Sequence, residues 1–327
     1  MKVSFIVPLY NCLPLTQAML ASLHATLPAG LAHEIILVDD GSTDGTRDWL
    51  RSVPAPARAL LNERNLGFAA TCNRGAAAAT GEFLFFLNND LELLPRWLEP
   101  MLALFRRIPD AGIVGNVQRN FATGAIDHAG LHFDAKGKPA HLTWRGVADV
   151  RSVDAVTGAC LAVRADLWRQ LGGFDEGYVN GCEDVDLCLR ASEAGRTNLV
   201  ALRSVVRHHV SASLGRKLRD EQNTARLFRR WRSFIIPRIV RPGCREWLAA
   251  AWEDPRDYPD PALAWDAFLH LAGLLPLPSP RLIEAAVALI EVEMARWRHL
   301  LHGGPERSAR EIAWQLFPSS RENPPAL

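Results

Sequence analysis

The stretch that decides the fold is Gly81–Pro95, which reads GEFLFFLNNDLELLP. Within it, Phe83–Leu87 is an unbroken apolar run that is rich in aromatic side chains and shorter than a typical helix. Such a run predicts a strand buried on both faces, as in a parallel sheet covered by helices. The strand is predicted to end in a polar cluster, because the run is followed directly by Asn88, Asn89 and Asp90.

This polar cluster has two interpretations. In open α/β sheets, ligands bind just beyond the carboxyl ends of the strands, and a carboxylate placed there can hold a hard cation and reach a phosphate. Alternatively, the cluster is a polar turn that stops a core strand, with Asp90 capping the next helix. The single stretch does not decide between these interpretations.

The flanking sequence alternates strand and helix signals. Strands are predicted over 3–7, 34–38 and 57–61, before the run at 83–87, and over 112–117, 153–163 and 199–206 after it. Helices are predicted over 13–27, 42–53, 68–80 and 164–171, and residues 121–150 are predicted as a loop or hairpin region. This alternation predicts an α/β fold with a mostly parallel sheet flanked by helices.

Composition places the chain among ordinary globular proteins. It has 327 residues, of which 48% are hydrophobic and 22% charged, with a formal net charge of +1. There is therefore no overall basic field that would indicate nucleic-acid binding. The six cysteines show no CxxC pair, so we expect reduced thiols and a cytoplasmic location.

No stretch is predicted to cross a membrane. The N-terminal sequence MKVSFIVPLYN becomes polar too soon for a signal peptide. The most apolar later stretch, 262–277, includes Asp266 and His270 and is shorter than the ~20 residues that a spanning helix needs.

The composition changes near residue 215, so we expect an α/β domain over 1–215 and a helical extension over 216–327. Between Arg203 and Arg245 there are twelve Arg or Lys residues and two acids. The first interpretation of this basic stretch is an amphipathic helix packed on the α/β domain. The second is contact with an anionic acceptor, which would place the protein peripherally at the inner membrane face. The tryptophans of the extension are expected to build a small helical core.

Two further strands are predicted to end in polar residues on the same edge as Asp90. The first ends in Pro8-Leu9-Tyr10-Asn11, and the second in Asp39-Asp40-Gly41. Turn and capping chemistry alone could explain either cluster. The first turn lacks GxGxxG, and the chain lacks GxxxxGK[ST], which argues against a dinucleotide fingerprint and a P-loop.

Seven ordered motifs carry a resemblance to a known family: SFIVPLYN, VDDGSTDGT, RNLGFAATCNRG, FLFFLNNDLELLP, VTGACLAVR, GGFDEGYVNGCEDVDLCLRASEAG and HHVSASLG. Together they resemble glycosyltransferase family 2, in the branch of bacterial rhamnosyltransferases and of O-antigen and cell-wall glycosyltransferases. The resemblance covers about residues 3 to 215. It implies a GT-A fold, in which a Rossmann-like half binds the nucleotide and a second half binds the acceptor.

The resemblance also implies a site for a nucleoside-diphosphate sugar. The corresponding positions here are Pro8, Tyr10, Asn11, Asp39, Asp40, Arg64, Asn65, Gly67, Asn88, Asn89 and Asp90. The triplet Asn88-Asn89-Asp90 replaces the acidic DxD signature, which leaves Asp90 as the one strong anionic ligand beside the diphosphate.

The pair Glu183-Asp184 is the candidate for proton transfer. Apolar periodicity from Val185 onward predicts an amphipathic helix that begins at this pair. Acids in a first helical turn also complement the helix dipole, which is a purely structural explanation. The resemblance implies that Asp184 is the general base and that Glu183, with Gly181, contacts or orients the acceptor. Asp186 is expected to face solvent or a neighbouring strand.

The histidines after the last predicted strand are candidate metal ligands. The family pattern VxH…S matches His208 with Ser213, and His209 is the adjacent alternative. A lone histidine near a core is more often structural. In the family, this histidine binds the metal or the diphosphate, so the resemblance implies Mg²⁺ or Mn²⁺ held by Asp90 and His208.

The predicted function is that of an inverting glycosyltransferase. It would move a sugar from a UDP-, dTDP- or GDP-activated donor to a hydroxyl on a glycan or lipid-linked glycan, as in polysaccharide biosynthesis. The alternatives are a non-catalytic nucleotide-sugar-binding module and a transferase that uses its helical tail to bind a protein or peptide acceptor. A nucleotidyltransferase is disfavoured, because the Glu183-Asp184 helix and the histidine have no evident role in one.

Overall fold

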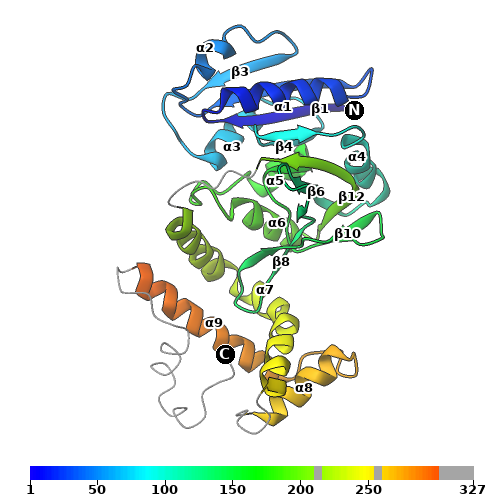
Figure 1. The fold of residues 1–327 in the computed structure, drawn as a ribbon, viewed down its shortest axis with the longest axis vertical. Coiled ribbons are helices and arrows are strands. Elements are labelled where there is room, and N and C mark those ends of the chain that lie inside the picture. The colour runs from blue at the N-terminus through cyan, green and yellow to red at the C-terminus, as the bar shows by residue number, and fades with distance from the viewer. Residues whose placement is uncertain (210–215, 254–259, 302–327) are drawn as a thin grey trace. The chain divides into compact units, whose positions relative to one another are not determined.

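The computed structural model describes residues 1–209, 216–253 and 260–301. The chain divides into two compact units (Figure 1). The α/β unit contains Met1–His132 and His141–Arg219. The helical unit contains Phe133–Ala140 and Asp220–Leu327, so a short internal segment belongs with the C-terminal part of the chain.

The α/β unit is built on one large sheet. Its main path runs in the order β10-β12-β6-β11-β4-β1-β2-β3, with β5 paired to β12 and β7 paired to β6. The strands are β1 (Lys2–Leu9), β2 (Ala32–Asp39), β3 (Ala57–Leu61), β4 (Phe83–Leu87), β5 (Leu91–Leu93), β6 (Ala111–Asn120), β7 (Ile126–His128), β10 (Val150–Ser152), β11 (Cys160–Arg164) and β12 (Thr197–His208). The predicted α/β class is confirmed.

Helices flank this sheet, as the alternating pattern predicts (Figure 1). They are α1 (Leu13–Thr26), α2 (Thr46–Leu50), α3 (Phe68–Ala78), α4 (Leu98–Arg107), α5 (Ala165–Leu171) and α6 (Glu183–Glu193). On the amphipathic helix α4, Met101, Leu102 and Phe105 face the core. This helix was not predicted from the sequence.

The core sits around β4. All five residues of this strand are buried, which confirms the prediction for Phe83–Leu87. The ring of Phe85 packs 5.6 Å from that of Phe5 and 5.8 Å from that of Trp97, measured between centroids. Aromatic pairs at such distances stabilise a core beyond the area that they bury.

The strand directions bring several chain segments to one edge of the sheet. Strands β1, β2, β4, β6 and β12 run parallel, so their carboxyl ends share that edge. Strand β11 runs antiparallel to β4, so it begins there. The amide of Asn88 donates to the carbonyl of Ala159 at 2.8 Å, which links the end of β4 to the residue before β11.

Two predicted elements are shorter than expected. The strand predicted over 153–163 begins only at Cys160, because Ala155 makes an isolated bridge with Leu131 and the chain then turns. The helix predicted over 42–53 is α2, Thr46–Leu50. Its predicted first turn fails because Asp39 and Asp44 accept hydrogen bonds from the amides of residues 42 and 46, which competes with helical pairing.

The helical unit contains α7 (Arg216–Glu253), which has a kink at Trp231, α8 (Pro261–Leu271) and α9 (Pro280–Leu301). Its core includes Trp247 and Trp297, whereas Trp252 and Trp265 are exposed and Trp314 lies outside the described residues. The predicted tryptophan core is therefore formed by only part of the set.

A hairpin of β8 (Leu131–Phe133) and β9 (Pro139–His141) contributes its tip to the helical unit. Gly137 at this tip has φ +72°, and a Cβ there would overlap the ring of Phe228. Glycine is therefore required, both for the left-handed backbone and for the close approach to α7. On the same tip, Nζ of Lys138 lies 3.1 Å from Oε1 of Glu221, which anchors the hairpin.

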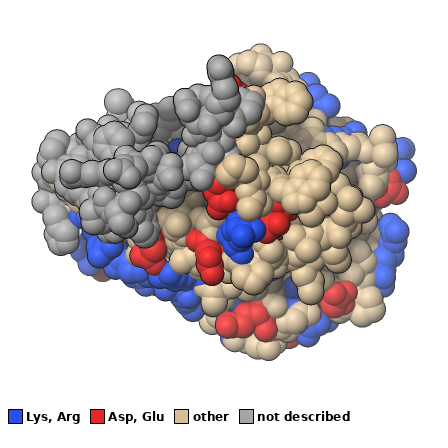
Figure 2. Space-filling model, turned by 90° about the horizontal axis from the view of Figure 1, so that it is seen from below, with Lys and Arg blue, Asp and Glu red and all other residues tan. Residues whose placement is uncertain are grey.

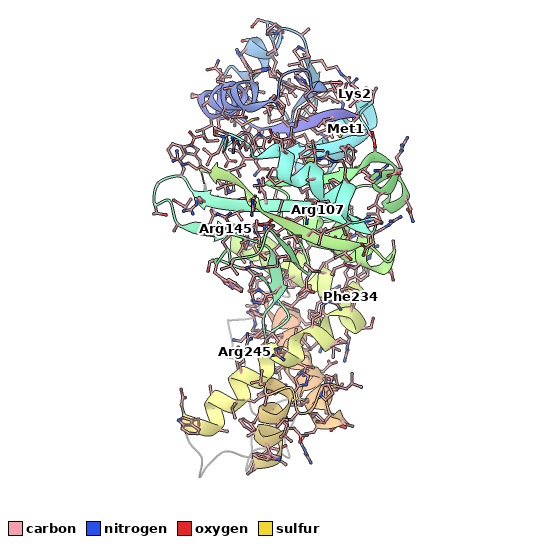
Figure 3. The ribbon with its side chains drawn as sticks, turned by 90° about the vertical axis from the view of Figure 1, so that its right-hand side faces the viewer. Met1, Lys2, Arg107, Arg145, Phe234 and Arg245 are labelled. Carbon is pink, nitrogen blue, oxygen red and sulfur yellow. The ribbon has the colours of Figure 1, made fainter. Side chains whose placement is uncertain are left out.

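Some of the basic side chains of α7 have partners within the helical unit. Arg232 forms an ion pair with Glu291, and outside the basic stretch Nη2 of Arg296 lies 2.9 Å from Oε2 of Glu221. Phe234 and Arg245 lie along α7 (Figure 3), and the guanidinium of Arg238 covers the Phe234 ring. Figure 2 shows acidic side chains interspersed with basic ones on the face that it presents. The packing of this helix on the α/β domain and its contact with an anionic acceptor both stay predictions.

No helix in the described part of the chain combines the length and apolarity needed to cross a bilayer. All six cysteines are free thiols.

Candidate functional site

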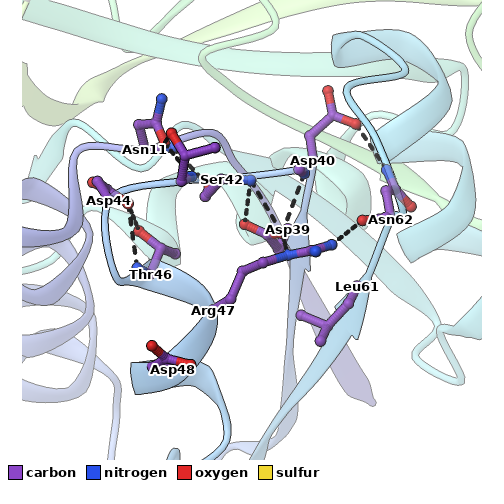
Figure 4. Close-up of polar contacts among 12 residues, drawn as sticks. Asn11, Asp39, Asp40, Ser42, Asp44, Thr46, Arg47, Asp48, Leu61 and Asn62 are labelled. Atoms are coloured by element: carbon purple, nitrogen blue, oxygen red, sulfur yellow. Dashed lines mark hydrogen bonds and ion pairs between the residues drawn. The ribbon is translucent and has the colours of Figure 1, made fainter.

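The first part of the site is the loop after β2, which Asp39 organises. Asp39 is fully buried, and its Oδ2 lies 2.7 Å from Nε of Arg47. Its carboxylate also accepts hydrogen bonds from the amides of Gly41 and Ser42 (Figure 4). Every contact of this carboxylate fixes the turn at the carboxyl end of β2.

Asp40 organises a second loop in the same way. Its Oδ1 accepts hydrogen bonds from Asn62 Nδ2 and from the amide of Leu66, each at 2.8 Å. Its Oδ2 accepts one from the amide of Gly67 at 2.9 Å. Asp40 therefore shapes the segment that presents the exposed side chains of Arg64 and Asn65.

The loop after β1 is joined to these two loops through Asn11. The amide of Asn11 donates to Ser42 Oγ at 2.7 Å, and its Oδ1 accepts from the amide of Thr43 at 2.8 Å (Figure 4). Tyr10 is 53% exposed and Pro8 is half-buried, so the Tyr10 ring is the accessible surface of this loop. The predicted nucleotide-sugar residues on β1, β2 and the Arg64 loop thus lie along one edge of the sheet.

Of the residues that follow β4, Asn89 holds the structure together and Asp90 faces the candidate site. Asn89 turns back toward α1, where its Nδ2 donates to Thr16 Oγ1 at 2.9 Å. Asp90 faces the end of β12 instead, and its Oδ1 lies 3.2 Å from Nε2 of His208. The pairing of Leu91 with His208 in strands β5 and β12 fixes this position. A strand therefore follows Asp90, not the helix that the capping interpretation requires.

Asp90 and His208 fit a divalent cation. Oδ1 of Asp90 is buried and accepts no hydrogen bond, because the approach of Nε2 of His208 lacks hydrogen-bond geometry. A carboxylate oxygen and an imidazole nitrogen that face each other without sharing a proton are a suitable donor set for Mg²⁺ or Mn²⁺. No group of three or more His, Cys, Asp or Glu gathers as a metal site in the described residues.

His209 occupies a different environment. Its amide donates to the carbonyl of Asp90 at 3.0 Å, and its ring stacks on Phe121 with 3.7 Å between centroids. Of the two histidines left open by the sequence, His208 is therefore the one whose ring faces Asp90.

Asp184 lies at the same edge. Its Oδ2 accepts a hydrogen bond from the amide of Gly158 at 2.7 Å, and its Oδ1 accepts one from the amide of Val185 at 2.8 Å. Gly158 precedes Ala159, the residue that bonds to Asn88. Burial raises the pKa of Asp184, and the hydrogen bond from Gly158 opposes this effect only in part. A raised pKa brings a carboxylate closer to the working range of a general base.

Glu183, the first residue of α6, is buried. It is 6% exposed, and its Oε2 accepts a hydrogen bond from the amide of Gly181 at 2.6 Å. Burial raises the pKa of the Cys72 thiol on α3, and the negative charge of Glu183 raises it further, so the carboxylate lies near that helix. Glu183 and Gly181 thus stabilise the loop before α6, and a contact with the acceptor stays a prediction.

The structure contradicts the expectation that Asp186 could face solvent. It is fully buried, and its Oδ2 lies 2.8 Å from Nε of Arg190, so it does not face solvent. The four-residue spacing of these opposite charges on α6 was a readable signal for this ion pair.

Three polar residues beside the site were not singled out from the sequence. They are Asp127 and His128 on β7 and His141 on β9. The Nδ1 atoms of the two histidines lie 3.0 Å apart, and Oδ1 of Asp127 is buried without a hydrogen-bond partner. The short strands that carry them give no periodic pattern in the sequence.

Solved structures of other proteins share the fold of this chain. The chain superposes on GalNAc-T7, solved with UDP, GalNAc and Mn²⁺, with a TM-score of 0.60 and 15% identity over 84% of this chain and 56% of that chain. It superposes on the mannosyltransferase PcManGT of Pyrobaculum calidifontis, solved with GDP-Man and Mn²⁺, with a TM-score of 0.54 and 19% identity over 89% and 86% of the two chains. The α/β unit therefore has the GT-A fold of glycosyltransferases.

Residues 4–161 match the family model described as Glycosyl transferase family 2. The chain thus carries a glycosyl transferase family 2 domain, as the resemblance of its motifs indicated.

The chain is 29% identical to the uncharacterized protein y4gI of Sinorhizobium fredii (85% of this chain, 30% of that protein). Two relatives whose names state a role agree with the family assignment. The chain is 33% identical to the O-antigen biosynthesis protein RfbC of Myxococcus xanthus (65% and 18%). It is 29% identical to the N-acetylglucosaminyl-diphospho-decaprenol L-rhamnosyltransferase of Mycobacterium tuberculosis (63% and 76%). The chain spans less than a third of the length of the first two relatives.

Proposed function

We propose that the chain is an inverting glycosyltransferase that transfers a sugar from a nucleoside-diphosphate donor to a hydroxyl acceptor, with Asp184 as the general base. One observation carries this proposal. The Gly158 amide holds Asp184 at the sheet edge, and Gly158 is covalently next to Ala159, which bonds to Asn88 at 2.8 Å. This chain of contacts links a carboxylate of raised pKa to the segment that presents Asp90 to His208.

The two carboxylates have different tasks in this mechanism. Asp90 and His208 would hold Mg²⁺ or Mn²⁺, which would supply positive charge beside the diphosphate of the donor. Asp184 accepts the proton of the acceptor hydroxyl as that oxygen attacks C1 of the sugar, which contributes typically ~10²–10⁴-fold to the rate. Attack from the face opposite the leaving group inverts the anomeric centre.

The loops around Asp39 and Asp40 would bind the nucleoside. Their buried carboxylates are fully used in shaping these loops, so the groups offered to a ligand are those that the loops present: the Tyr10 ring and the side chains of Arg64 and Asn65. A planar ring and a guanidinium suit a base and a phosphate respectively.

The named relatives support a hexosyl or deoxyhexosyl donor and a glycan or lipid-linked glycan acceptor. They act, by their names, in O-antigen biosynthesis and in rhamnosyl transfer to a diphospho-decaprenol glycan. A lipid-linked acceptor would bring the protein to the cytoplasmic face of the membrane as a peripheral protein.

A donor screen tests the proposal. UDP-, dTDP- and GDP-sugars are incubated with the chain and with aryl glycosides, a lipid-linked glycan or a peptide as acceptors, and consumption is followed by mass spectrometry with Mn²⁺ and with EDTA. We expect one nucleotide class to be consumed with Mn²⁺ and to be spared by EDTA. Donor binding in calorimetry without any turnover would favour a non-catalytic module instead.

A further inference from the structure

The stacked rings of Phe121 and His209 lie beside the proposed metal ligands and have no task in the mechanism above. Phe121 directly follows β6, and its amide donates to the carbonyl of His208 at 2.9 Å. The amide of His209 donates to the carbonyl of Asp90 at 3.0 Å. A backbone hydrogen bond therefore joins each of these residues to a proposed metal ligand, and the ring pair lies at the carboxyl edge of the sheet.

The turn that carries Phe121 is fixed by its own hydrogen bonds. Oδ1 of Asn120 accepts from two amides of the turn, each at 3.0 Å, and the carbonyl of Asn120 accepts from the amide of Gly124 at 2.8 Å. Nη1 of Arg119 donates to the carbonyl of Gly124, also at 2.8 Å. None of these bonds involves the side chain at position 121, and turns favour small or polar residues. The turn therefore does not explain a phenylalanine there.

Core packing does not explain this phenylalanine either. Phe121 is 45% exposed, whereas the phenylalanines of β4 are all buried. In the described part of the chain, the one aromatic ring that it contacts is that of His209, with 3.7 Å between centroids and 25° between planes. His209 covers one face of the Phe121 ring, so the opposite face is the exposed one. An accessible aromatic face that is held in place by a second ring is a preformed surface for a ligand.

The order of the strands places this surface on the acceptor side of the proposed metal ligands. The loops predicted to bind the nucleoside follow β1, β2 and β3, which form one end of the sheet. Strand β6, which leads to Phe121, lies on the other side of β4 and β11, next to β12. Gly158, whose amide bonds to Asp184, precedes β11, so the proposed base lies between the two regions. A donor with its nucleoside over β1 and β2 and its diphosphate at Asp90 leaves the region over β6 for the acceptor.

We propose that Phe121, supported by His209, binds a sugar ring of the acceptor by stacking. The face of a pyranose ring presents C–H bonds, whose hydrogens carry partial positive charge and are attracted by the negative face of an aromatic ring. The acceptor class is thus a glycoside, and not a simple alcohol or a peptide hydroxyl. This assignment rests on the proposed function, and it makes Phe121 a determinant of acceptor specificity.

The test compares sugar acceptors with a hydroxyl acceptor that has no ring. Wild type and variants are assayed with methyl hexopyranosides and with glycerol, using the nucleotide-sugar identified in the donor screen. Phe121→Ala should raise the KM for the preferred methyl glycoside about 10-fold and leave kcat nearly unchanged, because covering an apolar ring stabilises the bound substrate and the transition state alike. The rate with glycerol and the hydrolysis of donor without acceptor should stay near those of wild type.

Matched variants separate stacking from a structural role. Phe121→Tyr keeps an aromatic face and should keep the KM of wild type, whereas Phe121→Leu keeps an apolar side chain without that face and should raise KM. His209→Ala removes the supporting ring and should raise KM by less than Phe121→Ala does. Trp252→Ala removes an exposed aromatic ring from the helical unit and should change nothing. Thermal unfolding of each variant checks that the fold is intact.

Saturation-transfer NMR measures the contact without turnover. The preferred methyl glycoside is mixed with the protein, a nucleoside diphosphate and Mg²⁺, and the aromatic protons of the protein are irradiated. We expect saturation to reach the ring C–H protons of the glycoside in wild type and in Phe121→Tyr, and to fall in Phe121→Ala.

The outcomes distinguish the two proposals. A wild type that consumes no nucleotide-sugar refutes the transferase function and this assignment with it. Intact transfer with the same KM for methyl glycosides in wild type and Phe121→Ala overturns the assignment alone, also where the melting temperature of the variant falls. A KM for the donor in hydrolysis that rises in Phe121→Ala shows that the ring binds the donor, and this result also overturns the assignment while the transferase function stands.

Discussion

Carboxylates at the two edges of the central sheet differ in how completely their oxygens are hydrogen-bonded. At the amino edge, Glu34 on β2 accepts hydrogen bonds from Ser4 Oγ at 2.7 Å and from the amide of Thr80 at 2.8 Å. Lys2 and Arg58 form ion pairs with it at 3.5 and 3.3 Å. Burial alone would raise the pKa of Glu34, but Ser4, Thr80 and Lys2 lower it to about 2.

At the carboxyl edge, three carboxylates are less completely paired. Asp90 and Asp127 each have a buried Oδ1 without a hydrogen bond, and Asp184 has a raised pKa in spite of two backbone donors. Asp39 and Asp40 are the exceptions there, because both are saturated by protein donors. The comparison teaches that the chain stabilises its scaffold and loops with fully bonded carboxylates, whereas the carboxylate proposed as a metal ligand, Asp90, keeps one oxygen without a protein donor.

The largest expected effect comes from Asp184→Asn. Because the asparagine cannot accept the proton, transfer should fall by ~10²–10⁴-fold while donor binding persists. Two effects on stability oppose each other. A carboxyl whose folded pKa is raised stabilises at low pH, and this contribution is lost as the pH rises through that pKa, so a neutral side chain removes an unfavourable charge at pH 7. The asparagine has only one acceptor oxygen, however, so it leaves the amide of Gly158 or of Val185 without its partner.

Asp166→Asn is the matched control for this prediction, because this acid is exposed in the first turn of α5. It should change neither activity nor melting temperature. In wild type, the acid limb of the pH profile should lie above the range of an ordinary aspartate, and a limb near pH 4 would contradict the raised pKa of Asp184.

Asp40→Asn should have the next largest effect, and on stability. The amide group would place its own N–H donors against those of Asn62, Leu66 or Gly67, leaving at least one buried donor without a partner. We expect a loss of about 2–3 kcal/mol in the free energy of unfolding, measured by urea denaturation. Asp48→Asn, whose carboxylate is 78% exposed, is the control and should lose almost nothing.

Glu34→Gln should have a smaller effect and should spare activity. The folded pKa of about 2 lies below the unfolded value near 4.5, so the ionised form stabilises above pH 4.5. This contribution is lost as the pH falls from 4.5 to 2. We expect about 1–2 kcal/mol of destabilisation at pH 7, shrinking toward zero near pH 2. An undiminished difference at low pH would show that packing, not charge, explains it; exposed Glu99→Gln is the control.

The sequence made the scaffold predictable because the signals for it are local. The apolar run Phe83–Leu87, its polar end and the Glu183-Asp184 helix start each lie within a few consecutive residues. Their positions at one sheet edge follow from the shared direction of parallel strands. The seven motifs then indicated the family, and the resemblance to that family implied a role for each candidate site residue.

Contacts between distant short segments were not predictable. Strands β5, β7 and β9 have three residues each, too few to show alternation, so no pattern in the sequence predicts that His128 and His141 meet. The contact between the amide of Phe68 and Oδ1 of Asn180 at 3.1 Å joins segments more than a hundred residues apart. Which oxygens of Asp39 and Asp40 are used up by protein donors is likewise a property of the folded loops.

The smallest expected effect distinguishes two adjacent histidines. His209→Ala removes a ring that stacks on Phe121, which should lower stability by about 0.5–1.5 kcal/mol and leave the metal requirement unchanged. His208→Ala removes the nitrogen 3.2 Å from Asp90, so the Mn²⁺ concentration for half-maximal donor turnover should rise. Loss of one of two metal ligands should lower the affinity for Mn²⁺ and leave the maximal rate at saturating Mn²⁺ unchanged. The two variants are therefore compared over a full Mn²⁺ titration. A titration that shifts for His209→Ala and not for His208→Ala would show that His208 is not a metal ligand. The oxygen of Asp90 that accepts no hydrogen bond would then not mark a metal site, and the contrast between the two sheet edges would not reflect function there.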